Sequence, residues 1–293
     1  MPKIAAGAAG AAAAAPAIVE TRTGMTRGAI GAVFPRSSRG IVAALTAVAA
    51  LAAAVAAPGE ARADVLRVLV TNDDGVQAEG IDALARGLSR RPGVRVTIVA
   101  PATNQSGTAD RMTRGRLRAH RTRTRSGLRA VAVRGTPAAA VRFALDRTMR
   151  RAAPDLVVSG INDGANPGPI ATEVSGTVGA ARYAARRGLP ALATSQGRRT
   201  HGATRFGPAL RMTLRWFDAH RHALRPGTVT NINTPSCSRG SPRGLVRTVL
   251  ATELPPGMRR FRSVDCTRPS GRPADDVAAF LAGFAPVTGV PPR

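Results

Sequence analysis

The sequence predicts an α/β fold in which a mostly parallel sheet carries helices on both faces, with a small C-terminal extension. From residue 65 to residue 235, short apolar runs alternate with helical stretches, which is the pattern of repeated β-α-β units. The apolar runs are nearly continuous, as expected of strands that are buried on both faces of a parallel sheet. The chain has 293 residues, enough for one large α/β domain or two small ones. We therefore expect a Rossmann-like sheet.

Each element follows from this pattern. The expected strands are Val65–Thr71, Val94–Pro101, Arg129–Gly135, Asp155–Ile161, Leu189–Ser195 and Thr228–Pro235. The expected helices are 78–90, 138–150, 175–188 and 208–222. The first helix places Ile81, Leu84 and Leu88 on one face, and Gly188 is a suitable C-cap for the third. Beyond residue 235 the pattern weakens, and a short helix at 275–284 and an extended tail close the chain.

The first 63 residues differ from the rest because they are rich in alanine and poor in polar residues. Gly40–Ala57 is an unbroken apolar run preceded by two arginines, and Ala61–Ala63 fits the small-x-small rule of signal peptidase. We interpret residues 1–63 as a cleaved signal peptide, so that a secreted or periplasmic chain begins near Asp64. The alternative is a membrane anchor of about 18 residues, at the short limit for spanning a bilayer. Met25 is an alternative start of the protein.

The chain contains two cysteines, Cys237 and Cys266. They do not have the spacing of metal ligands, and in an exported chain two such residues favour one disulfide. Closing a loop of that length stabilises a fold by about 3 kcal/mol. The alternative is two unrelated buried thiols.

The chain is strongly basic. Residues 64–293 carry 37 arginines, no lysine and 15 acidic residues, a net charge of +22, and such a field attracts anionic partners. The near-absence of lysine indicates a coding bias towards arginine rather than selection for binding. The densest stretch, 111–130, lacks aromatic residues for base stacking, so we expect a solvated basic loop that binds nucleic acid only non-specifically.

Oxygen-bearing residues and glycines follow three of the expected strands. "TNDDG" (71–75) follows the first, "PATNQSG" (101–107) the second, and "SGINDGAN" (159–166) the fourth. Because these strands are parallel, the three segments meet at the carboxyl edge of the sheet, where ligands bind. The adjacent carboxylates of Asp73 and Asp74 repel each other, and a divalent cation such as Mg²⁺ or Mn²⁺ removes that repulsion. We therefore predict a metal site, against the alternative that one aspartate caps the next helix.

Five motifs occur in order along the chain: "TNDDG", "AP-x-x-NQSG", "GTPA", "SGIN-x-G-x-N" and "SGTVGAA". Through them, Val65 to Pro235 resembles the SurE (survival protein) nucleotidases, which are metal-dependent phosphatases. "DDVAAFLAGFAPVTG" near the end is similar to the C-terminal pattern of the family. We expect residues 64–235 to form the phosphatase core and residues 236–293 an extension or arm of the same domain. The resemblance also implies a homo-oligomer formed through that arm.

The resemblance assigns roles to residues in these motifs. The implied metal ligands are Asp73, Asp74, Ser106 and Asn162, and the two aspartates are also the implied catalytic residues. The residues implied to hold phosphate are Ser175, Gly176 and Thr177. They lie at the start of an expected helix, where ordinary N-capping and phosphate binding can occur together. The residues implied to face the substrate or support the ligands are Asn72, Asn104 and Asn166.

Three features depart from the family pattern, and all concern the substrate side. Ala139 stands after "GTPA", where the family usually has aspartate. The segment 167–174 lacks the common acidic pair and is about one residue longer. Val174 stands before "SGT", where tyrosine is usual. These departures bear on the nucleotide preference more than on the phosphatase chemistry.

The function predicted from these observations is an exported, metal-dependent phosphomonoesterase that hydrolyses nucleoside monophosphates or related esters with a metal-activated water. The alternative is a non-catalytic protein that binds anions or nucleic acid with its basic surface. No G-x-G-x-x-G turn follows the first strand and no G-x-S-x-G elbow is present, which disfavours a dinucleotide-binding protein and a serine hydrolase. The four histidines lie outside the motifs, and we expect them at the surface.

Overall fold

A computed structural model describes residues 65–256, 258 and 261–293. The predicted leader and its cleavage site lie outside the described residues. The strands are β1 (Leu66–Thr71), β2 (Val94–Pro101), β3 (Arg118–Arg123), β4 (Arg129–Arg134), β5 (Leu156–Asp163), β6 (Ala191–Gln196), β7 (Val229–Thr234), β8 (Cys237–Arg239), β9 (Leu245–Thr248), β10 (Val264–Asp265) and β11 (Ala285–Val290). The helices are α2 (Glu79–Ser89), α3 (Pro137–Phe143), α4 (Gly168–Val174), α5 (Gly176–Arg186), α6 (Gly207–His220) and α7 (Asp276–Leu281), with a π-helical turn, η1 (Ala144–Thr148), directly after α3.

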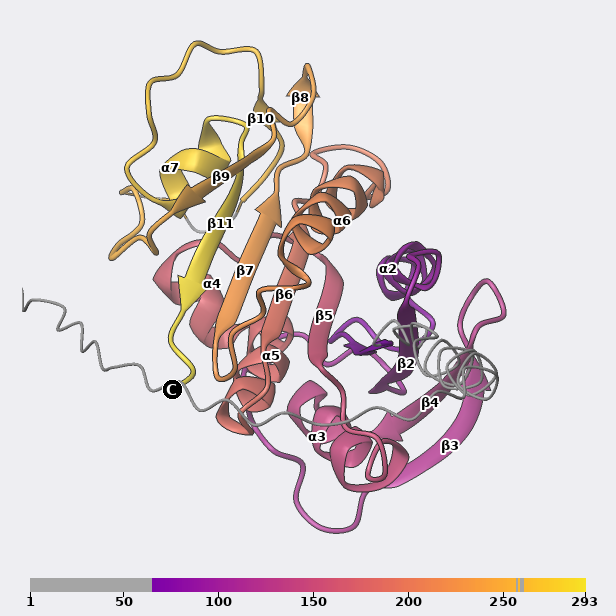
Figure 1. The fold of residues 1–293 in the computed structure, drawn as a ribbon. Helices are drawn as coiled ribbons and strands as arrows, with labels where there is room; N and C mark the ends of the chain where they lie inside the picture. The colour runs from indigo at the N-terminus through magenta and orange to yellow at the C-terminus, as the bar shows by residue number, and fades with distance from the viewer. Residues whose placement is uncertain (1–64, 257, 259–260) are drawn as a thin grey trace, which may run out of the picture. The chain divides into compact units, whose positions relative to one another are not determined.

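The central element is a nine-stranded sheet with the order β3-β4-β2-β1-β5-β6-β7-β11-β9 (Figure 1). The strands β4, β2, β1, β5, β6 and β7 are mutually parallel. Strand β3 runs antiparallel to β4, and β11 runs antiparallel to β7. The predicted mostly parallel sheet is therefore confirmed.

Helices cover both faces of the sheet, as predicted. Successive side chains of a strand point to opposite faces, and in β1 Val68 and Val70 join one apolar cluster while Leu69 joins the other. The first cluster contains buried residues of α2 and α6, such as Leu84, and the second contains residues of α3 and α5, such as Val178. Two layers of helices thus hold the carboxyl ends of the strands in fixed positions.

The expectation of a basic loop over residues 111–130 is wrong in one part, because Arg118–Arg123 forms strand β3 and pairs with β4. This strand lies at the edge of the sheet and its residues are mostly exposed, so it lacks the alternation of polar and apolar residues that identifies a half-buried strand. The hairpin is fixed to α2, where the carboxylate of Asp82 accepts hydrogen bonds from the hydroxyls of Thr124 (2.5 Å) and Ser126 (2.6 Å).

Two helices also differ from expectation. The helix expected over 138–150 ends as an α-helix at Phe143 and continues as the π-helical turn η1. Helix α4 was not expected, because its first turn contains Gly168 and Pro169, which are typical of loops. The backbone of Gly168 has a φ of +75°, a conformation that glycine adopts without strain.

The C-terminal residues belong to the main sheet. The segment described from the sequence as an extended tail is β11, which pairs with β7 on one side and with β9 on the other. A disulfide joins Cys237 to Cys266, with their Cα atoms 5.6 Å apart. None of the helices in the described residues has both the length and the apolar character needed to cross a membrane.

Candidate functional site

The candidate site lies where the order of the strands reverses. From β1 the chain builds outwards through β2 to β4 and then returns to place β5 on the other side of β1. Ligands bind at such a switch point, outside the carboxyl ends of the two central strands. Asp73 and Asp74 follow β1, and Asn162 and Asp163 end β5. The topology thus brings together the first and third of the polar segments that the sequence singled out.

Asp73 is held against the start of α5. Its side chain is 2% exposed, and its Oδ1 accepts a hydrogen bond of 2.6 Å from the hydroxyl of Thr177. A Cβ atom on Gly176 would lie 2.8 Å from the Cβ of Asp73, so only glycine allows the helix to approach this closely. Burial raises the pKa of Asp73, while the Thr177 hydroxyl and the backbone N–H groups of Thr177 and Gly176 act in the opposite direction.

Asp74 is the more accessible carboxylate of the pair. Its Oδ2 accepts a hydrogen bond of 2.9 Å from the backbone N–H of Asp163, and its Oδ1 lies 3.4 Å from Nδ2 of Asn104. Burial, followed by the negative charges of Asp73 and Asp163, raises the pKa of Asp74 to about 6. The two adjacent carboxylates therefore cost free energy in the metal-free fold, as the repulsion argument predicts.

A tight turn presents the two aspartates. Nδ2 of Asn72 donates to the carbonyl of Gly75 (2.9 Å), and Gly75 has a φ of +100°. A Cβ on Gly75 would lie 3.0 Å from the carbonyl carbon of Thr103, so the turn also packs against the loop after β2. The Oδ1 atom of Asn72 is buried and has no hydrogen-bond partner among the described residues.

The loop after β2 lies beside this turn. The backbone N–H of Gln105 donates to the carbonyl of Asp73 (2.7 Å), and the backbone N–H of Ser106 donates to Oδ1 of Asn104 (2.9 Å). The structure thus brings Ser106 and Asn104 to the aspartates, and the exposed hydroxyl of Ser106 is available for a ligand. Asn104 uses its side chain to connect Asp74 with Ser106.

The two asparagines after β5 have different surroundings. Nδ2 of Asn162 donates to the carbonyl of Gly164 (2.5 Å), which leaves the amide oxygen for a ligand. Asn166 is tied to the neighbouring strands, because its Nδ2 donates to the hydroxyl of Ser195 (3.1 Å) and its N–H donates to Oδ1 of Asn233 (2.7 Å). Asn166 therefore shapes the loop next to the site.

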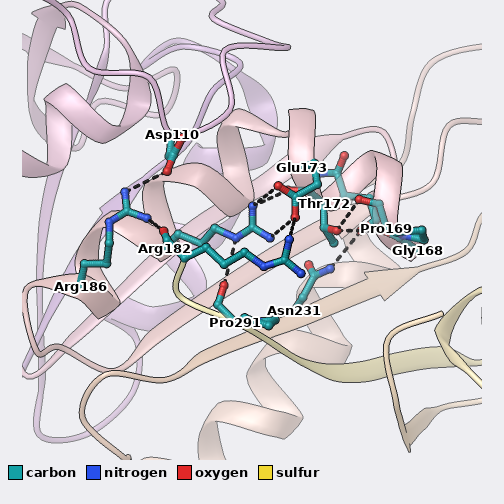
Figure 2. A network of polar contacts seen from close by, with 11 residues as sticks. Asp110, Gly168, Pro169, Thr172, Glu173, Arg182, Arg186, Asn231 and Pro291 are labelled. Carbon is teal, nitrogen blue, oxygen red and sulfur yellow. Dashed lines mark hydrogen bonds and ion pairs between the residues drawn. The ribbon is translucent and has the colours of Figure 1, made fainter. Parts of the chain in front are cut away.

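The segment Ser175–Thr177 begins α5. The Oγ atom of Ser175 accepts a hydrogen bond from the N–H of Val178 (3.2 Å), so Ser175 is an N-cap. A network behind this corner includes the buried guanidinium of Arg182, which donates to the carboxylate of Glu173 (2.8 Å) and to the carbonyl of Pro291 (3.2 Å) (Figure 2). Helix α4, helix α5 and the end of the chain are thus fixed together. Phosphate binding by Ser175–Thr177 stays a prediction.

Sequence reasoning missed Asp163 and Arg198. Asp163 lies inside "SGINDG", a segment in which the sequence predicted a role for Asn162 but none for Asp163. Its Oδ1 accepts a hydrogen bond from Thr204 (2.6 Å), and its carbonyl accepts one from Nε of Arg198 (3.0 Å). Arg198 follows β6, so the reasoning about carboxyl ends of strands, applied to that strand as well, would have identified it.

The donor set of the site consists of oxygen atoms. Within the described part of the chain, no three or more His, Cys, Asp or Glu side chains gather closely enough to hold a metal ion. A cation at this site would therefore combine Asp73 and Asp74 with the neutral oxygens of Ser106 and Asn162. This set, together with the costly carboxylate pair, fits a hard divalent cation. All four histidines are exposed, as predicted.

These features define an α/β protein with an acidic site at the switch point of its parallel sheet. The family model described as "Survival protein SurE" matches residues 68–254. The chain belongs to the SurE family, and the resemblance inferred from its motifs is confirmed.

Individual relatives agree with this assignment. A protein of Burkholderia lata named 5′-nucleotidase SurE 1 is 40% identical over 184 residues, which are 61% of this chain and 68% of the relative. A 5′-nucleotidase SurE of Solidesulfovibrio magneticus is 36% identical over 233 residues, 78% of this chain and 84% of the relative. The crystal structure of a SurE protein from Aquifex aeolicus has a TM-score of 0.62 at 26% identity, covering 78% of this chain and 94% of that one.

Proposed function

We propose that the chain is an exported, divalent-metal-dependent phosphomonoesterase that hydrolyses nucleoside monophosphates. The observation that carries the proposal is the pair Asp73 and Asp74 at the switch point. Hydrogen bonds from Thr177 and from the N–H of Asp163 hold the two carboxylates in place, although the pKa of each is raised. The hydrolase class rests on the family, whose relatives described above are named 5′-nucleotidases. This family membership also sets aside the alternative of a non-catalytic binding protein.

The two aspartates have different surroundings and therefore different roles. Asp73 is fixed by Thr177 and the first N–H groups of α5, and it holds its carboxylate in one orientation as a ligand. Asp74 is more accessible, and with a pKa of about 6 it is suited to accept the proton of the attacking water. The residues that would hold the cation are these two, Ser106 and Asn162. A bound Mg²⁺ or Mn²⁺ would supply a Lewis acid for the phosphoryl oxygen and lower the pKa of a water molecule.

The start of α5 orients the phosphate ester. Its N-terminus carries partial positive charge, Ser175 is its N-cap, and Gly176 lies beside Asp73. Because the N–H groups of Gly176 and Thr177 are directed at Asp73 and that of Val178 at Ser175, this end of the helix attracts the phosphate through its partial charge.

Export and oligomerisation belong to the same proposal. Export is supported by the apolar run and cleavage signal in residues 1–63 and by the disulfide between Cys237 and Cys266, since disulfides persist in oxidising compartments. A homo-oligomer is supported by the family resemblance alone, and its test is the mass of the purified protein in solution.

The test of the activity is phosphate release from adenosine 5′-monophosphate and from 4-nitrophenyl phosphate, with Mg²⁺ or Mn²⁺ and with EDTA. We expect release that EDTA abolishes and that Asp73→Asn removes while the circular dichroism spectrum is kept. The matched control is Asp218→Asn on α6, an exposed carboxylate paired with Arg91, which keeps the activity. No release from either ester, or release that EDTA leaves unchanged, would contradict the proposal.

A further inference from the structure

A pocket of about 550 Å³ opens beside the acidic site. Gly164, directly after Asp163, is part of its wall, and so is Arg198. Nε of Arg198 lies 3.0 Å from the carbonyl of Asp163, whose N–H is bonded to Asp74. The pocket therefore borders the loop that is bonded to Asp74.

The polar part of the pocket is positively charged. Arg198 and Arg199 follow β6, and Arg262 comes from the segment before β10. The described residues that line the pocket include no carboxylate. Nε of Arg198 lies 3.4 Å from Oδ1 of Asp163 and forms an ion pair with it. In the described part of the chain, no ion pair with an acidic side chain involves Arg199 or Arg262. The two guanidinium groups of Arg199 and Arg262, which lack such a partner, favour an anionic group in the cavity, in addition to the phosphate at the acidic site.

The rest of the wall is apolar. Ile170 and Val174 of α4 are 61% and 53% exposed, which is unusual for large apolar side chains of this protein, and both line the pocket. Phe261, from the segment before β10, also lines the pocket. Its ring makes an edge-to-face contact with the ring of Phe280, with the centroids 5.4 Å apart. Aliphatic and aromatic side chains of this kind pack against a flat heterocycle.

We propose that the preferred substrate is a nucleoside bisphosphate, with one phosphate at the acidic site and the base and second phosphate in this pocket. This inference rests on the proposed function. A nucleoside monophosphate brings only its neutral ribose and base into the pocket and leaves the arginines without an anion. A linear polyphosphate supplies the anions, but it places charged oxygens against Phe261, Ile170 and Val174. A nucleoside bisphosphate matches both parts of the wall.

The reaction remains an ordinary hydrolysis. The oxygen of water forms a new bond to phosphorus, and the bond from phosphorus to the ester oxygen breaks. The ester oxygen takes a proton and becomes the product hydroxyl, and inorganic phosphate leaves. The second phosphate stays on the product, which is a nucleoside monophosphate.

The test compares kcat/KM for adenosine 3′,5′-bisphosphate, adenosine 5′-monophosphate and tripolyphosphate at constant ionic strength, with the divalent cation present. For the wild-type protein we expect the bisphosphate to exceed the monophosphate at least tenfold, the effect of one or two charge-assisted hydrogen bonds. The double variant Arg199→Gln/Arg262→Gln should bring this ratio close to one. The matched control is Arg215→Gln, which removes an exposed arginine of α6 outside the pocket and should keep the wild-type ratio.

A second variant separates nucleotides from other polyanions. Phe261→Leu should raise KM for the bisphosphate several-fold and leave tripolyphosphate hydrolysis as it was. Equal kcat/KM for mono- and bisphosphate in an active wild-type protein would overturn this inference and leave the proposed function standing. A preference for tripolyphosphate that the arginine variants abolish would also overturn it. Failure to hydrolyse any of the three compounds would instead overturn the proposed function.

Discussion

Replacement of Asp74 by asparagine should stabilise the metal-free protein while abolishing its turnover. In the folded chain, burial and the charges of Asp73 and Asp163 raise the pKa of Asp74 from 3.8 to about 6. A carboxyl group whose folded pKa is raised destabilises the fold when it ionises. This cost is absent well below pH 3.8, grows as the pH rises, and is complete above about pH 6. Asp74→Asn removes the charge and with it the cost.

The magnitude follows from the same shift. A rise from 3.8 to about 6 corresponds to about 3 kcal/mol at pH 7.5 and to about 1 kcal/mol at pH 4.5. Asparagine keeps only one acceptor oxygen for the two hydrogen bonds from Asp163 and Asn104, which costs about 1 kcal/mol. The net gain is about 2 kcal/mol at pH 7.5 and close to zero at pH 4.5. For a chain of this size, the gain at pH 7.5 raises Tm by roughly 4–8 °C.

The assay is thermal unfolding of three EDTA-treated proteins at pH 7.5 and at pH 4.5: the wild type, Asp74→Asn and the control Asp218→Asn. Phosphate release is then measured on the same samples after the divalent cation has been restored. The control replaces an exposed, ion-paired carboxylate and should change stability by less than about 1 kcal/mol. An Asp74→Asn protein that is less stable than wild type at pH 7.5 and still active would show that Asp74 caps a helix rather than binds a metal. An equal gain at both pH values would show that ionisation of Asp74 is not its cause.

Three other outcomes are expected. Protein recovered from the exported fraction should begin at or near Asp64 by N-terminal sequencing, whereas an intact N-terminus on membrane-bound protein would contradict the leader. Thiol titration of the denatured, unreduced protein should find neither Cys237 nor Cys266 free, and two free thiols would refute the bond. Reduction should lower the free energy of unfolding by about 3 kcal/mol for a loop of this length. Thr177→Val keeps the shape of the side chain but removes the donor to Asp73. We expect kcat to fall about 10–100-fold and Tm to stay within a few degrees of wild type. Full activity would show that this hydrogen bond does not position Asp73.

The acidic site was predictable because its geometry follows from the order of the elements. In a parallel sheet the carboxyl ends of adjacent strands share one edge, so the motifs containing Asp73 and Asn162 had to meet once their strands were recognised. The hydrogen bond from Thr177 to Asp73 was not predictable in the same way. It depends on how closely α5 approaches β1, which the absence of a side chain at Gly176 decides.

The elements that the sequence did not predict lack the patterns that identify strands and helices. Strand β3 lies at an edge and is exposed on both faces, so its arginines show no alternation. Helix α4 begins with Gly168 and Pro169. The pocket combines Arg199 with Arg262, which lie far apart in the sequence. The residues that follow them are joined by a hydrogen bond from the N–H of Thr200 to the hydroxyl of Ser263 (2.9 Å), a tertiary contact that cannot be derived from local periodicity.

The hydrogen bonds around the two aspartates explain why a pair of identical side chains divides into two roles. Asp73 is almost completely buried, which raises its pKa, and the hydrogen bonds from Thr177 and from the N–H groups that begin α5 offset this only in part while they fix the orientation of the carboxylate. Asp74 has weaker support, with one backbone N–H and one long contact to Asn104, and it carries the repulsion of the pair. The pKa values of both carboxyl groups are therefore raised, and the pair resists full ionisation in the metal-free fold. In the proposed mechanism the more accessible Asp74 is therefore the carboxylate that takes a proton from water, and Asp73 is the one with a fixed orientation.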